Sequence, residues 1–142
     1  MALDTFSRAR VLPFVSMSMY LIDPASSRED GIVFVKLTGR AQAETIVKLL
    51  SELNALAERE PAVRVLIDET ELGAGFVGPS DIGRIAQAWR KAVALRSVRI
   101  AAFASNPVIY GLNRMFQGLA EGAEHVTVFN DRARAKAWLL ES

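Results

Sequence analysis

Apolar and polar residues alternate along the first patterned segment of this chain, Val15–Ile22. A period of two is typical of a half-buried β-strand. The apolar positions are Met17, Met19 and Leu21. Turn-forming residues fill Asp23–Gly31, and a second apolar run, Ile32–Leu37, follows them. Because a parallel crossover needs about a dozen residues or more, this short connection predicts an antiparallel pair of strands.

Beyond Gly39 the pattern switches between helical spacing and short apolar runs. Isoleucine and leucine residues at helical spacing predict a helix that Pro61 ends. Three further helices are expected. One covers Ile82–Val93, and a second covers Ile109–Leu119 behind the cap residue Asn106. Asn130 and Asp131 cap the last, which ends at Ala137–Leu140. The strands between the helices are Val63–Ile67, Val98–Ala104 and Val126–Phe129.

The order of these elements predicts an α/β fold built on one sheet. Strands that alternate with helices pair in parallel through right-handed crossovers. We therefore expect a single five-stranded mixed sheet, parallel apart from its first strand, with about four helices packed against it. Residues 15–142 form one domain in this interpretation, and residues 1–14, which show no clear period, form an amino-terminal arm.

Composition narrows the class of protein without identifying a partner. The 142 residues are 51% hydrophobic and 23% charged, which is typical of a globular domain. The net charge is +1 with no concentrated basic face, so we expect no binding to nucleic acid. Arg8, Arg10 and Pro13 interrupt the apolar residues near the start, so this segment lacks the continuous apolar core of a signal peptide. No run approaches the roughly 18 apolar residues of a membrane span. We expect a soluble, cytoplasmic protein.

The stretch Val63–Gly83 is the strongest candidate for a working surface. It runs from a buried strand through a glycine-rich loop into a helix, and open α/β sheets meet their ligands outside the carboxyl ends of the strands. Asp68, Glu69 and Thr70 stand where the strand is expected to end. Neighbouring strand residues point to opposite faces, so the two acids should not share a proton. They are either functional acids with perturbed pKa values, or loop-facing carboxylates that are solvated or bonded to nearby backbone amides.

Three glycines of the loop, Gly73, Gly75 and Gly78, match the G-x-G-x-x-G string of dinucleotide sites. In such a site the first glycine follows the strand directly and the last opens the helix, whereas here extra residues intervene at both ends. We therefore favour a mobile loop whose glycines permit positive φ angles. Phe76 and Val77 lie within it. They are covered by a protein partner, a second copy of the chain or an apolar ligand, unless Phe76 folds back onto the core.

Two sets of residues on the following helices are further candidates. Ser80 is either an N-cap or a phosphoacceptor, because a phosphate is stabilised by the free amides at a helix amino terminus. Asn106, Tyr110 and Arg114 share one face of the next helix. Tyr110 and Arg114 either meet an anionic or aromatic group or form a solvated helix face.

The chain lacks the residue sets that most catalysis and metal binding need. Cys is absent, and the one histidine, His125, has no apparent partner in the sequence pattern. No nucleophile–base pair or cofactor motif appears. We therefore expect a protein without enzymatic activity, metal or cofactor.

Three segments resemble a known family. VRVLIDETELGAGFVGPSDIG resembles the central segment of STAS domains, the sulfate-transporter and anti-sigma-factor-antagonist fold. With SVRIAAFASNPVIYGLNRMFQ and VFNDRARAKAWL, the chain from about Tyr20 to Leu140 is similar to the SpoIIAA-like relatives. The resemblance implies a regulatory or binding protein. In anti-sigma-factor antagonists a partner kinase phosphorylates a serine at the start of the helix after this loop. Ser80 matches that serine by position, whereas the family's Asp-Ser-Ser-Gly string is absent here.

Two functions follow as hypotheses. The first is a non-enzymatic STAS-like module that binds a protein partner, such as a regulatory kinase or a sigma-factor regulator, through the surface around residues 68–81. The second is a small-molecule carrier or sensor that holds a lipid, a nucleotide or another anion between the glycine loop and the helix at residues 106–116. Lipid-transfer relatives of similar architecture favour the second. A homodimer is compatible with both.

Overall fold

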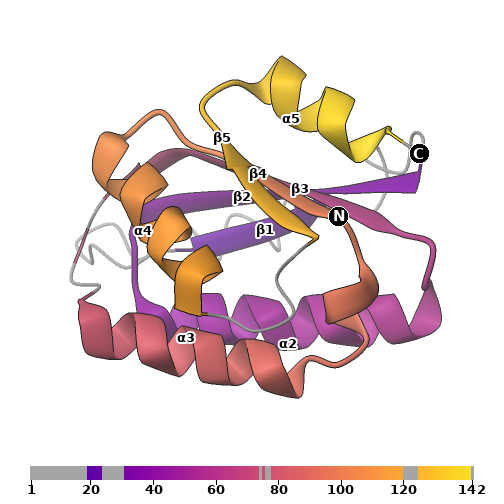
Figure 1. The fold of residues 1–142 in the computed structure, drawn as a ribbon, viewed down its shortest axis with the longest axis horizontal. Coiled ribbons are helices and arrows are strands. Elements are labelled where there is room, and N and C mark those ends of the chain that lie inside the picture. Colours follow the sequence, from indigo (N-terminus) through magenta and orange to yellow (C-terminus); the bar gives the residue numbers. More distant parts are fainter. Residues whose placement is uncertain (1–18, 24–30, 74, 76–77, 120–124, 142) are drawn as a thin grey trace, which may run out of the picture.

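A computed structural model describes residues 19–23, 31–73, 75, 78–119 and 125–141 (Figure 1). The predicted amino-terminal arm, most of the predicted turn at Asp23–Gly31, and Phe76 and Val77 lie outside these residues. The five strands form one sheet in the order β1-β2-β3-β4-β5. Their bounds are Met19–Asp23 (β1), Ile32–Arg40 (β2), Arg64–Gly73 (β3), Ile100–Phe103 (β4) and Val126–Phe129 (β5).

Strand pairing agrees with the predicted mixed sheet. β1 runs antiparallel to β2, with Met19 opposite Thr38 and Asp23 opposite Phe34. The pairs β2–β3, β3–β4 and β4–β5 are all parallel. The prediction of a single five-stranded α/β sheet with one antiparallel strand is therefore confirmed.

The helices divide unequally between the two faces of the sheet. They are α2 (Ala43–Arg59), α3 (Pro79–Lys91), α4 (Pro107–Leu119) and α5 (Arg132–Leu139), with a 3₁₀ turn, η2, at Leu95–Ser97. In Figure 1, α2 and α3 lie below the sheet and α5 lies above it. Buried residues of α2, α3 and α4 share one core with the sheet, which we call the large core, and α5 covers a small core on the opposite face.

Helical spacing explains how these helices bury their apolar faces. In α2, Leu49, Leu53 and Leu56 recur every three or four residues and are all buried. Ile82, Ile85 and Trp89 follow the same spacing in α3. The predicted caps Asn106 and Asp131 are confirmed, because their side-chain oxygens accept hydrogen bonds from the amides of Val108 and Ala133 at 2.8 Å each.

The inward face of β1 differs from the alternation predicted from the sequence. Leu21, which the pattern places with the apolar positions, is 39% exposed, whereas Tyr20 and Ile22 pack against the large core. Pairing with β2 explains the difference, because Tyr20 lies opposite Leu37 and Ile22 opposite Val35, both fully buried. Residues directly opposite each other share a face, so the register decides which side chains turn inward.

Candidate functional site

A β-bulge lies where the sequence predicts that the central strand ends. Lys36 of β2 is paired with Asp68, and two residues later Thr38 is paired with Glu71, so three residues of β3 advance against two of β2. The prediction that the strand ends at Ile67 is therefore wrong, and β3 continues to Gly73. The strand continues because β2 also extends beyond its predicted end, to Arg40, and supplies a partner.

Asp68 stabilises the bulge. Its Oδ1 accepts one hydrogen bond from the backbone amide of Thr70 at 2.9 Å and a second from the Thr70 hydroxyl at 2.6 Å. Asp68 is 9% exposed, so the interpretation of a solvated carboxylate is wrong, and the alternative of a bond to a nearby backbone amide is confirmed. At a bulge, backbone amides lose their regular partner in the neighbouring strand. The Asp68 carboxylate replaces that partner for the Thr70 amide and also accepts from the Thr70 hydroxyl.

The bulge also changes which side chains after Glu69 face inward. Ile67, Glu69 and Leu72 all face the same cavity, although regular alternation would place Glu71 in the third position. Glu71 instead forms an ion pair with Lys36 at 2.6 Å and is largely exposed. Asp68 and Glu69 therefore point to opposite faces of the sheet, as the sequence predicts.

The cavity that Glu69 faces, here called the central cavity, lies between the sheet and helices α2, α3 and α4. Its volume is about 110 Å³. Of the described residues that line it, Glu69 and Asn113 are the two polar ones and the others are apolar. The apolar lining is Leu37, Ala41, Ile46, Leu49, Leu50, Leu53, Ile67, Leu72, Ile82, Ile85, Trp89, Ile100, Ala102, Ile109, Leu112, Phe116 and Val126.

Glu69 and Asn113 form the polar centre of this cavity. Asn113 Nδ2 donates to Glu69 Oε1 at 2.7 Å and to the carbonyl oxygen of Ile109 at 2.9 Å. Burial raises the pKa of Glu69 from an ordinary value of 4.5 to about 7, against the lowering effect of the Asn113 hydrogen bond, and the charge of Asp68 adds to the rise. Near neutral pH this carboxyl can therefore both donate and accept hydrogen bonds.

The glycine-rich loop passes close to the cavity wall at Ala41. The amide of Ala41 donates to the carbonyl oxygen of Gly73 at 2.8 Å. Gly75 has a φ of 59°, and a β-carbon built there would lie 2.5 Å from the carbonyl oxygen of Ala41. A positive φ is thus confirmed at Gly75, whereas Gly73 belongs to β3 and Gly78 has a φ of −114°.

This architecture has a counterpart among solved structures. The chain is similar to an uncharacterized protein from the DUF3478 family with a SpoIIAA-like fold, from Shewanella loihica PV-4. The TM-score is 0.56 at 18% sequence identity, and the match covers 88% of this chain and 97% of the other. The chain has a SpoIIAA-like fold. Neither a protein-family model nor a curated protein matches the sequence.

Within the SpoIIAA-like fold, two predicted site residues, Thr70 in β3 and Ser80 in α3, lie outside the cavity lining. Thr70 is exposed and is held by Asp68. Ser80 is exposed in the first turn of α3, but its predicted role as N-cap is wrong. The cap residue is Gly78, whose carbonyl oxygen accepts from the amide of Ile82 at 3.1 Å and whose amide donates to Asp81 Oδ2 at 3.0 Å.

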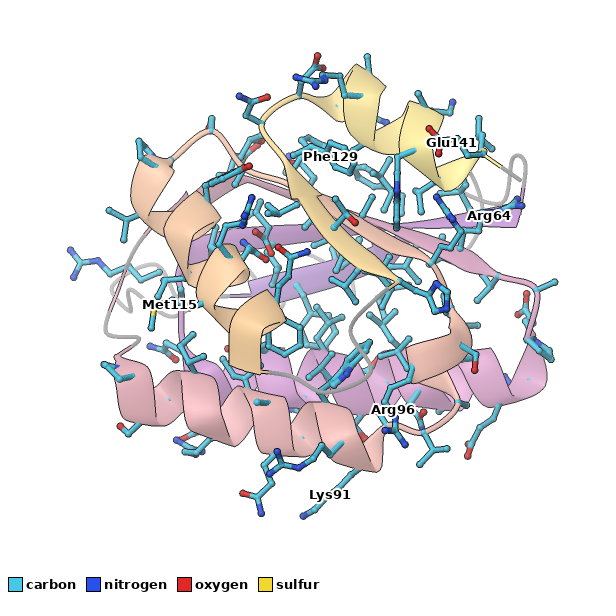
Figure 2. The ribbon with its side chains drawn as sticks, in the orientation of Figure 1. Arg64, Lys91, Arg96, Met115, Phe129 and Glu141 are labelled. Atoms are coloured by element: carbon cyan, nitrogen blue, oxygen red, sulfur yellow. The ribbon has the colours of Figure 1, made fainter. Side chains whose placement is uncertain are left out.

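The candidates on α4 do not line the cavity either. Asn106 caps the helix, Tyr110 packs against the large core, and Arg114 is exposed. Figure 2 shows Met115 on the outer side of α4, and its side chain is 43% exposed. The other side of the helix carries the cavity residues. His125 is exposed directly before β5, at the opposite end of the strands from the loop that follows β3. Its carbonyl oxygen accepts a hydrogen bond from the amide of Ile100 at 2.8 Å.

Asn113 is the functional candidate that the sequence interpretation missed. It lies among the apolar positions of α4, between Ile109, Leu112 and Phe116. A hydrogen-bonding side chain within an apolar helix face is a signal for a buried polar contact, because such a group needs a partner. Its partner, Glu69, is 44 residues away in sequence, so the pair becomes visible once the helix is packed on the sheet.

Proposed function

We propose that the chain binds a small, mainly apolar molecule in the central cavity. The observation that carries this proposal is the Glu69–Asn113 pair at the wall of an otherwise apolar space. Ligand sites typically combine a hydrophobic lining with a few polar groups that orient the occupant. A buried carboxyl that serves packing alone would be costly, because burial disfavours its charged form.

The size of the cavity limits the occupant. An engineered cavity of about 150 Å³ in another protein holds benzene, so a volume of about 110 Å³ corresponds to a molecule of about that size or smaller. A long-chain lipid would require the cavity walls to separate. Among the residues that the structure describes, the lining has no lysine or arginine, so a nucleotide or another anion would enter without a countercharge and next to Glu69. An uncharged molecule is therefore the better fit.

Binding without turnover is part of this proposal. Glu69 and Asn113 can orient a bound group, but no other lining residue that the structure describes could act as a nucleophile or a metal ligand. Within the described part of the chain, no group of three or more His, Asp or Glu residues could hold a metal ion, and no helix is long and apolar enough to cross a membrane.

A native mass spectrum of the protein isolated from its own cells tests the proposal. We expect a non-covalent adduct whose mass is that of a small organic molecule. Leu112→Trp, which enlarges a cavity-lining side chain on α4, should abolish the adduct. Leu140→Trp is the matched control, because Leu140 is 42% exposed and does not line the cavity, and this variant should retain the adduct. An adduct that survives Leu112→Trp would contradict binding in the cavity.

A regulatory function through a protein partner is the second candidate, and one observation favours it. Ser80 is exposed in the first turn of α3, where a phosphate would lie near the free amides of the helix amino terminus. Asp68 and Glu69 are buried, so they cannot contribute to an exposed partner surface. The same spectrum tests this function, since a covalent phosphate present on the wild type and missing from Ser80→Ala would support it. A spectrum without covalent phosphate would count against it.

A further inference from the structure

We propose that the central cavity accepts an uncharged molecule with a hydrogen-bonding group, and that binding requires protonated Glu69 and so takes up a proton wherever Glu69 of the free protein is ionised. This inference rests on the proposed function, because it specifies the chemistry and the pH dependence of the same site. It concerns the form of Glu69 that can coexist with an occupant.

The surroundings of Glu69 leave its charge poorly compensated. The side chain is 6% exposed, and its described hydrogen-bond partner is the neutral amide of Asn113. The other cavity-lining residues of β2, β3, β4, β5, α2, α3 and α4 carry no titratable side chain. Asp68 is the charged group whose field acts on Glu69, and it raises the pKa as burial does.

An apolar occupant makes ionisation harder still. The molecule displaces water from the cavity. Because that water would solvate the ionised carboxylate, its removal disfavours the charged form of Glu69. The pKa of Glu69, about 7 before binding, should therefore rise further in the complex. By linkage, a group that is protonated more readily in the complex makes affinity strongest at low pH and weaker as pH rises above the pKa of the free protein.

Protonated Glu69 also defines the polar end of the occupant. The neutral carboxyl has one O–H donor and retains acceptor capacity, so it suits an alcohol, a ketone or an amide. An ammonium ligand would instead pair with ionised Glu69. That pairing would bring a second charge out of water into the apolar lining, and the desolvation penalty applies to both ions. The two alternatives predict opposite pH dependences.

Three probes with a four-carbon body distinguish them, namely n-butanol, n-butylammonium and butyrate. Binding is measured by NMR chemical-shift titration at about pH 5.5 and about pH 8.5. If butanol binds only when Glu69 is protonated, and the pKa of Glu69 is about 7, the Kd of butanol should be about thirtyfold larger at the higher pH. Butylammonium and butyrate should bind more weakly than butanol at both pH values. Glu69→Gln, a neutral side chain of nearly the same shape, should bind butanol equally well at the two values.

A measurement on the wild type makes the test independent of that variant. The ¹³C shift of the Glu69 carboxyl reports its titration directly. Saturating butanol should raise the midpoint by about one pH unit at tenfold excess over Kd. A lower midpoint with butylammonium, or equal butanol affinity at both pH values, would overturn the inference and leave the proposed function standing. If none of the probes binds at either pH, both the inference and the proposed function are overturned.

Discussion

Asp68 and Glu69 are adjacent acids with opposite structural roles. Asp68 accepts hydrogen bonds from the amide and the hydroxyl of Thr70 and so holds the bulge. Glu69 lies on the other side of the strand, in the apolar cavity, where burial suits the neutral form. Consecutive residues of a strand point to opposite faces of the sheet, so the two carboxyls lie in different environments although they are adjacent in sequence.

Replacement of Glu69 tests its environment through stability. The folded chain binds the Glu69 proton more tightly than the unfolded chain, because the folded pKa is about 7 against an ordinary 4.5. Its stabilising contribution is therefore complete below about pH 4.5 and is lost as pH rises through about 7. The total loss is of the order of 3 kcal/mol. Glu69→Gln should remove most of this loss, as measured by denaturant unfolding at a series of pH values.

Glu71→Gln is the matched control for this prediction. Glu71 is on the same strand but largely exposed, in an ion pair with Lys36, so its replacement should preserve the pH dependence of the wild type. If Glu69→Gln showed the same loss of stability across this range as the wild type, the buried-acid account would be wrong.

At the scale of elements, α4 is the least firmly packed wall of the cavity. Among the α4 side chains that the structure describes, Ile109 is buried and the others are half-buried or exposed. Two contacts position the carboxyl-terminal half of α4. The Phe116 ring meets Trp89 edge to face at 5.7 Å, and Gln117 Nε2 donates to the carbonyl oxygen of Val126 at 2.6 Å. If the cavity expands for a larger occupant, α4 is the wall expected to move.

The connection after β3 provides a second prediction at this scale. Gly75→Ala introduces a β-carbon 2.5 Å from the carbonyl oxygen of Ala41 and 2.8 Å from its nitrogen, at a φ of 59°. We expect the free energy of unfolding to fall by about 1–2 kcal/mol from the backbone conformation, and by more from the overlap. Thermal and denaturant unfolding measure the change.

Gly83→Ala is the control for this prediction. Gly83 lies in α3, and a β-carbon there meets nothing within 4 Å. This variant should gain up to about 1 kcal/mol from improved helix propensity. Equal effects of the two substitutions would show that contact with Ala41 does not constrain the loop.

At the scale of the whole molecule, hydrophobic periodicity predicted the layers well and the cavity poorly. Alternating strand and helix patterns specified the sheet, because each pattern directly reflects which faces are buried. The end of β3 was missed because the acids Asp68 and Glu69 interrupt the apolar run, while their burial depends on pairing with β2 and on Asn113. Such contacts join distant segments and leave no periodic trace in the sequence.

Binding of a small molecule in the central cavity can be observed by an isoleucine-methyl NMR titration with n-butanol. The titration is carried out at about pH 5.5, where Glu69 is largely protonated. Isoleucine methyl groups around the cavity should shift with a common saturation curve. Those residues are Ile46, Ile67, Ile82, Ile85, Ile100 and Ile109. Ile32, buried in the small core on the other face of the sheet, serves as the internal control and should not shift. Unchanged cavity methyl groups, or shifts as large at Ile32, would show that butanol does not bind in the central cavity.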